Sequence, residues 1–238
     1  MLDGDSVQSY TLLEEKQIVS RIWGKDPSLW SNKLVDIQGN TGWFDSVKWI
    51  ENKRTLLEKF STEIKARKFE TVVLIGMGGS SLTSFVVSSL FASNKVDTKF
   101  VILDTIVVPS IESLHQKLDY ANTLFIIASK SGETLETNIL YEYFYNQVAI
   151  KNGYEKAGSF FVAITNDGSP LHTIAKESNF SNIFLNPPDI GGRFSALSYF
   201  GIVPALCMGV SLDSVISVVS KMIHSCSETV CITDNSAI

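Results

Sequence analysis

The 238-residue sequence lacks a long hydrophobic run and a surplus of basic residues. Its apolar stretches are interrupted by Ser, Gly or Asp before they reach the ~20 residues that a membrane-spanning helix needs, so we expect no membrane segment. Its 20 basic residues are outnumbered by 25 acidic ones, which gives a formal net charge of -5. This balance argues against binding to a nucleic-acid backbone, although single Lys or Arg side chains can still serve a small anion.

Cysteine is scarce, and the N-terminus carries no secretion signal. Cys207, Cys226 and Cys231 are odd in number and lack the spacing of metal ligands. Asp3 and Asp5 stand where a signal peptide would have basic and then apolar residues. We therefore expect a reduced, cytoplasmic protein without a metal site.

The first 66 residues have a helical pattern. One helix is expected over residues 11–23, ended by the Gly and Pro of residues 24–27, and a second over residues 44–64, where apolar residues recur at helical spacing. The segment also contains all four tryptophans, Trp23, Trp30, Trp43 and Trp49. Such a cluster either packs the segment onto a larger domain or stacks on a sugar or base, and we expect packing.

After residue 67, short apolar runs alternate with helix-competent segments. The runs cover residues 71–75, 100–103, 123–128, 160–164 and 182–185, and the helical segments cover residues 81–92, 110–118, 134–150, 170–177, 196–208 and 213–224. This alternation predicts a parallel sheet with helices on both faces, which binds ligands beyond the carboxyl ends of its strands, near the reversal of strand order. We expect a helical extension (1–66) followed by an α/β domain (67–238).

The first apolar run ends in a glycine-rich segment. Gly76, Gly78 and Gly79 follow it directly, and a helix is expected to begin near Ser81. Glycines allow close backbone approach, and a helix N-terminus attracts anions. Ser81 stands where a dinucleotide fingerprint needs its third glycine, and the Gly-Lys-Ser/Thr of a phosphate loop is also missing. The segment is either an anion site or a tight turn without a ligand.

The third apolar run ends in a hydroxyl-rich segment. Ser129, Ser131 and Thr134 supply hydroxyls and Lys130 supplies a positive charge, a combination that suits a phosphate group. Alternatively, Ser131 is a helix N-cap with Glu133 in the first turn. Because two such strand ends are expected in adjacent βα units, we predict one shared phosphate site, with the acidic side chains pointing away.

The fifth apolar run is followed by a glycine pair and an arginine. Gly191 and Gly192 allow the chain to turn and present Arg193 just before a helical segment. A guanidinium in that place can hold an oxyanion with a permanent charge. It can equally form a salt bridge, for example with Asp189.

Together these segments resemble the phosphoglucose isomerase family. The segments 76–80, 129–134 (with Glu136-Thr137) and 191–195 occur in the order and rough spacing seen in that family. The segments 22–30 and 189–201 look most like the isomerase half of transaldolase–phosphoglucose isomerase fusions. The resemblance spans essentially the whole chain, while each motif alone is shared more loosely among sugar-isomerase (SIS) domains.

The resemblance implies a SIS-type three-layer α/β/α sandwich with a five-stranded parallel sheet, preceded by the helical extension. It implies cofactor-free aldose–ketose isomerisation of glucose 6-phosphate and fructose 6-phosphate through a cis-enediolate. By position, Ser129, Ser131 and Thr134 match the phosphate-binding residues with Lys130 beside them, Gly79 and Ser80 match the sugar-contacting turn, and Arg193 matches the enediolate-stabilising arginine.

The sequence departs from the family at two positions and lacks a recognisable base. Glu133 replaces a hydroxyl residue, and Pro188 stands where the family has an acidic or small polar residue. The family's catalytic glutamate, and the histidine and lysine that open the sugar ring, belong to a second SIS domain. We therefore expect an N-terminal half that binds sugar phosphate weakly, turns over little or nothing, and forms a homodimer or associates with a missing second SIS half.

Other candidate residues are less specific. His115, His172 and His224 are expected to have surface or packing roles. Asp104 and Asp167 follow the second and fourth runs and either bind sugar hydroxyls or cap helices. An alternative function is a non-catalytic sugar-phosphate-binding SIS module.

Overall fold

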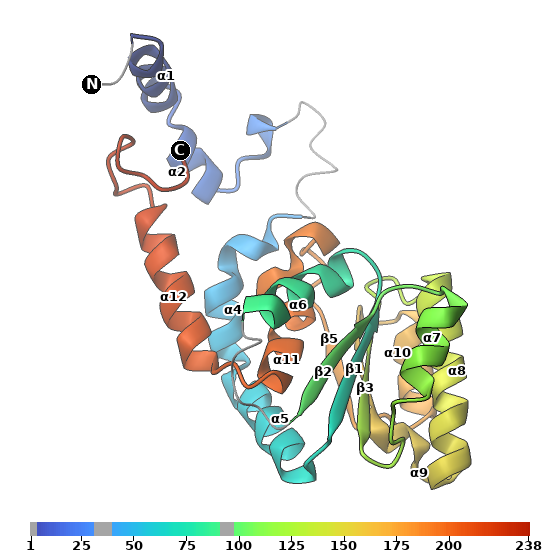
Figure 1. Ribbon diagram of the computed structural model, residues 1–238. Helices are drawn as coiled ribbons and strands as arrows, with labels where there is room; N and C mark the ends of the chain where they lie inside the picture. The colour runs from blue at the N-terminus through green and yellow to red at the C-terminus, as the bar shows by residue number, and fades with distance from the viewer. Residues whose placement is uncertain (1–3, 31–39, 91–97) are drawn as a thin grey trace.

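A computed structural model describes residues 4–30, 40–90 and 98–238 (Figure 1). Its centre is a five-stranded, wholly parallel sheet in the order β2-β1-β3-β4-β5. The strands are β1 (Thr71–Gly76), β2 (Lys99–Leu103), β3 (Thr123–Ala128), β4 (Phe161–Thr165) and β5 (Asn182–Leu185). Every expected apolar run forms a strand, and helices cover both faces, so the predicted α/β/α fold class is confirmed.

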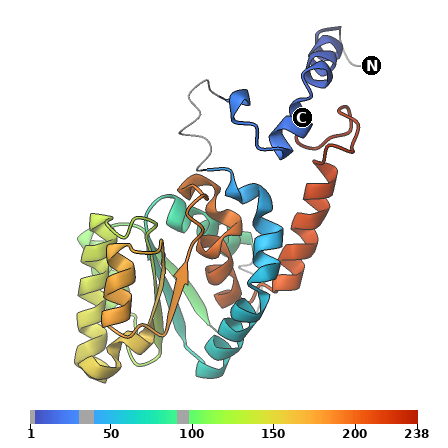
Figure 2. The ribbon, with the colours of Figure 1, turned by 180° about the vertical axis from the view of Figure 1, so that it is seen from behind.

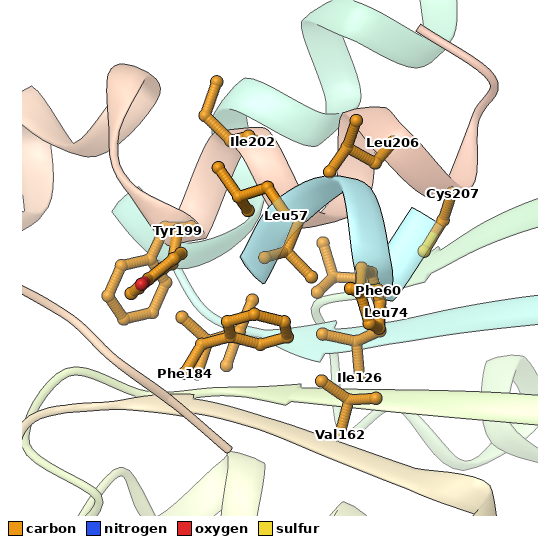
Figure 3. Close-up of a cluster of buried hydrophobic side chains, with 14 of the residues drawn as sticks. Leu57, Phe60, Leu74, Ile126, Val162, Phe184, Tyr199, Ile202, Leu206 and Cys207 are labelled. Carbon is orange, nitrogen blue, oxygen red and sulfur yellow. The ribbon is translucent and has the colours of Figure 1, made fainter. Parts of the chain in front are cut away.

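Alternate residues of each strand supply two separate cores. In β1, Val72 and Leu74 face one core, whereas Val73 and Ile75 face the other. This follows from the period of two along a strand, with both faces buried as a parallel sheet requires. Figure 3 shows the first core, where Leu74, Ile126 and Val162 of the sheet meet side chains from the helices.

The helices form one layer on each face of the sheet (Figure 1). The first core is covered by α4 (Ser46–Asn52), α5 (Arg54–Arg67), α11 (Tyr199–Cys207) and α12 (Leu212–Ser225), with α6 (Gly79–Leu90) packed against α11. The second core is covered by α7 (Val108–His115), α8 (Leu135–Asn152) and α10 (Pro170–Glu177), while α9 (Tyr154–Ala157) and the 3₁₀ turn η3 (Gly158–Phe160) lead into β4.

The N-terminal extension is more broken than its sequence pattern indicates. It contains α1 (Gly4–Glu15), α2 (Ile18–Trp23) and the 3₁₀ turns η1 (Pro27–Leu29) and η2 (Gly42–Asp45) before α4 and α5. The single helix expected over 11–23 is wrong, because Gln17 has a left-handed backbone (φ 50°) that ends α1 and separates it from α2. The helix expected over 44–64 is likewise interrupted, at Lys53, whose φ of -102° and ψ of 5° lie outside helical geometry.

The extension and the C-terminal segment lie side by side. α12 packs along α4 and brings the C-terminus close to α2 (Figures 1 and 2). The indole Nε1 of Trp23 donates to the backbone oxygen of Cys226 at 2.8 Å. Within the described ranges, no helix is long and apolar enough to cross a membrane.

Candidate active site

The reversal of strand order lies between β1 and β3, which are neighbours at the centre of the sheet. At such a point the loops that follow the two strands diverge and leave a crevice. Here they border a cavity of about 360 Å³. Its lining consists of Met77, Gly79, Ser80, Lys130, Ser131, Thr134, Asn166 and Gly192. The structure thus brings the three sequence segments to one cavity, which we call the switch-point cavity.

The glycine-rich segment forms the first wall of this cavity. Gly78 has a φ of 55°, a left-handed conformation that favours glycine. α6 begins at Gly79, two residues before the start expected near Ser81. A Cβ on Gly79 would overlap the backbone carbonyl of Gly192, so only glycine lets the third segment come this close.

The hydroxyl-rich segment forms the second wall. Ser129 is buried, accepts a hydrogen bond from the Gly132 backbone N–H (3.1 Å) and has its Oγ 3.1 Å from Thr134 Oγ1. It therefore supports the loop rather than lining the cavity. Ser131 is exposed and accepts from the Glu133 N–H at 3.2 Å. The alternative that Ser131 is the N-cap of the next helix is wrong, since α8 begins at Leu135 and Thr134 occupies the N-cap.

The two acidic side chains of this segment do not line the cavity. Glu133 is exposed and Glu136 is partly exposed, and neither is among the lining residues. The repulsion that these carboxylates would exert on a bound anion is thereby reduced. The lining residues themselves carry hydroxyls, backbone N–H groups and one ammonium, which is the chemistry of anion binding.

Lys130 ties the second wall to two other loops. Its Nζ donates to the carbonyl of Pro188 at 3.3 Å, and its own carbonyl accepts from the Asn166 backbone N–H at 3.1 Å. Asn166, which the sequence reasoning missed, follows β4 and lines the cavity. Its Oδ1 is buried and has no hydrogen-bond partner within the described part of the chain. The available signal was its place at a strand end, which it shares with Asp167.

Neither aspartate considered from the sequence lines the cavity. Asp167 is exposed, and its Oδ1 lies 3.0 Å from Nδ1 of the buried His172. Asp104 is exposed after β2. The histidines are also elsewhere: Nδ1 of His115 is 2.8 Å from the Tyr120 hydroxyl, and His224 is in the last turn of α12. No carboxylate or imidazole of the described residues lines the cavity, so it holds no evident general base.

The arginine segment forms the third wall, but Arg193 itself faces a different space. Gly192 lines the switch-point cavity and begins the 3₁₀ turn η4 (Gly192–Leu197). Arg193 lines an adjacent cleft of about 530 Å³ that shares Gly192 with the cavity. The cleft is otherwise lined by Trp30, Asn40, Thr41, Trp43, Phe44, Gly191 and Phe194. Among described residues, no carboxylate forms a salt bridge with Arg193, so the alternative of a pair with Asp189 is wrong.

The aromatic residues of the extension divide between packing and the cleft. Trp49 packs edge-on against Tyr199 beside the first core, as expected for a packing role. Trp43 and Trp30 instead line the cleft beside Arg193. Among the described residues, no three His, Cys, Asp or Glu side chains are grouped so that they could hold a metal ion.

This chain is similar to known proteins over most of its length. The family model described as "Phosphoglucose isomerase" matches residues 28–224. The chain belongs to the phosphoglucose isomerase family. It is 31% identical over 196 residues to glucose-6-phosphate isomerase from Prochlorococcus marinus subsp. pastoris, covering 81% of this chain and 36% of that protein. It is 30% identical over 200 residues to the Methanocaldococcus jannaschii enzyme, covering 83% of this chain and 46% of that protein.

Solved structures of phosphoglucose isomerases and related proteins share the fold. A hypothetical protein from Thermus thermophilus matches with a TM-score of 0.81 at 25% identity, over 96% of this chain and 52% of that one. A glucose-6-phosphate isomerase from Chlamydia trachomatis matches with a TM-score of 0.63 at 24% identity, over 91% and 38%. The chain therefore spans about half or less of the length of these relatives.

Proposed function

We propose that the switch-point cavity binds the phosphate group of a hexose 6-phosphate. The observation that carries this proposal is the convergence of Ser131 and Thr134 with Lys130 on one cavity at the strand-order reversal, opposite the turn of Gly79 and Ser80. Hydroxyls, an ammonium and the N-terminus of α6 together offer donors and positive potential to a dianion. Buried Ser129 holds the second wall in shape through its contact with Thr134.

The proposed reaction is interconversion of glucose 6-phosphate and fructose 6-phosphate. In this scheme the phosphate occupies the cavity, the sugar carbons extend past Gly192, and Arg193 stabilises the enediolate with a permanent charge. Family membership supports the reaction class. Gly192 lines both the switch-point cavity and the cleft of Arg193, which supports a sugar that extends from one into the other. Gly79 and Ser80 contact the sugar at the first wall.

The proton-transfer groups would come from a second SIS unit. Because the described lining contains no carboxylate or imidazole, residues 1–238 alone are expected to bind sugar phosphate weakly and turn over little or nothing. The second unit is proposed to be a further SIS half or a second copy of the chain. We propose a cytoplasmic location, where the three free cysteines remain reduced, and a reaction that needs no cofactor.

Calorimetric titration of the 238-residue protein with fructose 6-phosphate tests this proposal. Saturable binding is expected, and Ser131→Ala/Thr134→Ala should abolish it because two donors to the phosphate are removed. Ser110→Ala, at an exposed site on α7, is the matched control and should bind normally. Absence of binding by a well-folded wild-type sample would contradict the proposed phosphate site, and measurable isomerisation lost in Arg193→Ala would contradict the expected inactivity.

A non-catalytic sugar-phosphate-binding module is the second candidate. The lack of a lining base among the described residues favours it, whereas Arg193 is a residue that sensing alone does not require. The two functions can be distinguished by mixing the chain with the purified second SIS half of a related enzyme. Restored isomerase activity that depends on Arg193 supports the enzyme, and binding without restored activity supports the module.

A further inference from the structure

The N-terminal extension is clamped onto the loop that carries Arg193. In η2, the Gly42 backbone N–H donates to the Asp189 carbonyl at 3.0 Å. Gly42 is buried, and a Cβ at this position would overlap the Asp189 carboxylate. The two segments are about 150 residues apart in the sequence, so this contact is a built tertiary junction rather than local turn geometry.

The residue after Gly42 extends this junction to the neighbour of Arg193. The Trp43 ring stacks on the Phe194 ring with centroids 5.6 Å apart and planes 12° apart. Trp43 also stacks on Phe44 at 3.9 Å. Stacked aromatic pairs of this kind contribute beyond the burial of their area.

The stack lies at the surface, which argues against a purely core-packing role. Trp43 is 36% exposed and Phe194 is 49% exposed, whereas Trp49 of the same extension packs beside the first core. Both stacked rings line the cleft that Arg193 also lines. A packing tryptophan would be expected to bury its ring, so this placement suits a role in shaping the cleft.

The position of Arg193 depends on how its loop backbone is held, because no carboxylate of the described chain forms a salt bridge with its side chain. On one side, the single proton of the Ser195 hydroxyl is shared between the carbonyls of Gly192 (2.7 Å) and Gly79 (3.2 Å), which anchors the loop to the switch-point cavity. On the other side, Gly42 and Trp43 hold it to the extension. The arginine thus lies between two anchors on different parts of the chain.

We propose that Trp43 is a positioning residue, whose ring holds Phe194 and thereby sets the place of Arg193 relative to the switch-point cavity. The inference deepens the proposed function and rests on it for the role of Arg193. In this proposal the helical extension contributes to the site by positioning Arg193. Trp43 contributes through the arginine and has no direct contact with the phosphate group, whose cavity it does not line.

A double-mutant cycle on the 238-residue protein tests this coupling. Fructose 6-phosphate and inorganic phosphate are titrated into wild type, Trp43→Ala, Arg193→Ala and the double variant. Each single variant should weaken fructose 6-phosphate binding roughly tenfold, as expected if Arg193 also donates a charged hydrogen bond to the substrate oxygens on which the enediolate develops. The double variant should be no weaker than Arg193→Ala. Binding of inorganic phosphate should be unchanged in all four, because the proposed phosphate donors Lys130, Ser131 and Thr134 belong to the second wall, which no variant alters.

Two further variants separate positioning from general packing. Trp43→Phe keeps an aromatic face toward Phe194 and should restore binding to near the wild-type value. Trp30→Ala removes a tryptophan that lines the same cleft, 50% exposed, for which no stack on Phe194 is observed, and it should bind like wild type. Additive losses in the double variant, or equal weakening of inorganic phosphate, would overturn the inference.

Limited tryptic cleavage gives a readout that does not depend on sugar binding. Release of the loop in Trp43→Ala should speed cleavage after Arg193 relative to cleavage after Lys221 of α12, while Trp43→Phe should not. Equal acceleration at both sites would indicate general unfolding, and no acceleration at Arg193 would also overturn the inference. If wild type fails to bind fructose 6-phosphate, the proposed function fails, and the cleavage ratio still decides whether Trp43 holds the Arg193 loop.

Discussion

The Ser195 hydroxyl donates to the Gly79 carbonyl at 3.2 Å and joins two segments that are 116 residues apart. Ser195 is buried at 2% exposure, so water has little access to its hydroxyl. It links the glycine-rich turn after β1 to the turn that carries Arg193. The walls of the switch-point cavity therefore hold one another in place.

Gly79→Ala should destabilise the protein and weaken sugar-phosphate binding. The new methyl group would overlap the Gly192 carbonyl and force the third segment away, at a cost of about 1–3 kcal/mol typical of overpacking. Gly192→Ala is the matched control, because nothing lies within 4 Å of its Cβ position. Its free energy of unfolding should stay within about 0.5 kcal/mol of wild type. Denaturant unfolding measures the stability of both variants, and equal stabilities would contradict the close approach of Gly79 to the Gly192 carbonyl.

Asn166→Ala should reduce affinity for fructose 6-phosphate without changing affinity for methyl phosphate, whose dianion carries no O–H group. The buried Oδ1 of Asn166 is an acceptor without a partner in the described chain, and the dianion of a phosphate monoester offers no proton to it, whereas a sugar hydroxyl does. Loss of one neutral hydrogen bond corresponds to a decrease of about two- to tenfold. Paired calorimetric titrations with the two ligands measure the difference.

The neighbouring aspartate supplies the control for this amide. Asp167→Asn alters an exposed side chain that does not line the cavity, so both affinities should remain within about twofold of wild type, a change of ~0.4 kcal/mol. An equal loss of affinity for both ligands in Asn166→Ala would show instead that the amide supports the loop.

Stability should decline in alkaline solution because of two buried acids. Burial raises the pKa of Cys207 from 9.0 to about 12 and that of Tyr199 from 10.0 to about 12. The unfolded chain therefore ionises first, and stability present below pH ~9 is lost as the pH rises toward 12. Tyr199→Phe should lose less stability than wild type between pH ~8 and ~11, measured by denaturant unfolding.

The sheet was predictable because its strands are buried on both faces. All six residues of β3 are buried, and a run of such residues between polar segments has few other interpretations. The extension was harder, because the break after α1 depends on the left-handed backbone of Gln17, an exposed residue with no periodic signal. Helix periodicity detects which face is apolar and gives little information about where the backbone turns.

The candidate site was predictable in its segments and less so in its details. The loops after β1 and β3 had to meet once the strands were parallel neighbours, which the glycine- and serine-rich ends indicated. Asn166 was missed because it and Asp167 are both polar residues after β4. The sequence does not show which of the two side chains the loop directs toward the cavity. Arg193 faces a neighbouring cleft because η4 places successive residues on different sides, a matter of tertiary contacts with Gly79 and Trp43.

The position of the cavity over β1 and β3 also means that its walls are supported by different parts of the fold. These central strands are bonded to neighbours on both sides, so the Ser80 and Thr134 walls rest on the part of the fold that opens least often. The η4 wall rests on no strand and is held instead by packing on α6 and α11 and by the Ser195 hydroxyl. A ligand would thus have its anionic end held by walls built on the sheet, and its other end beside a wall built on helix packing.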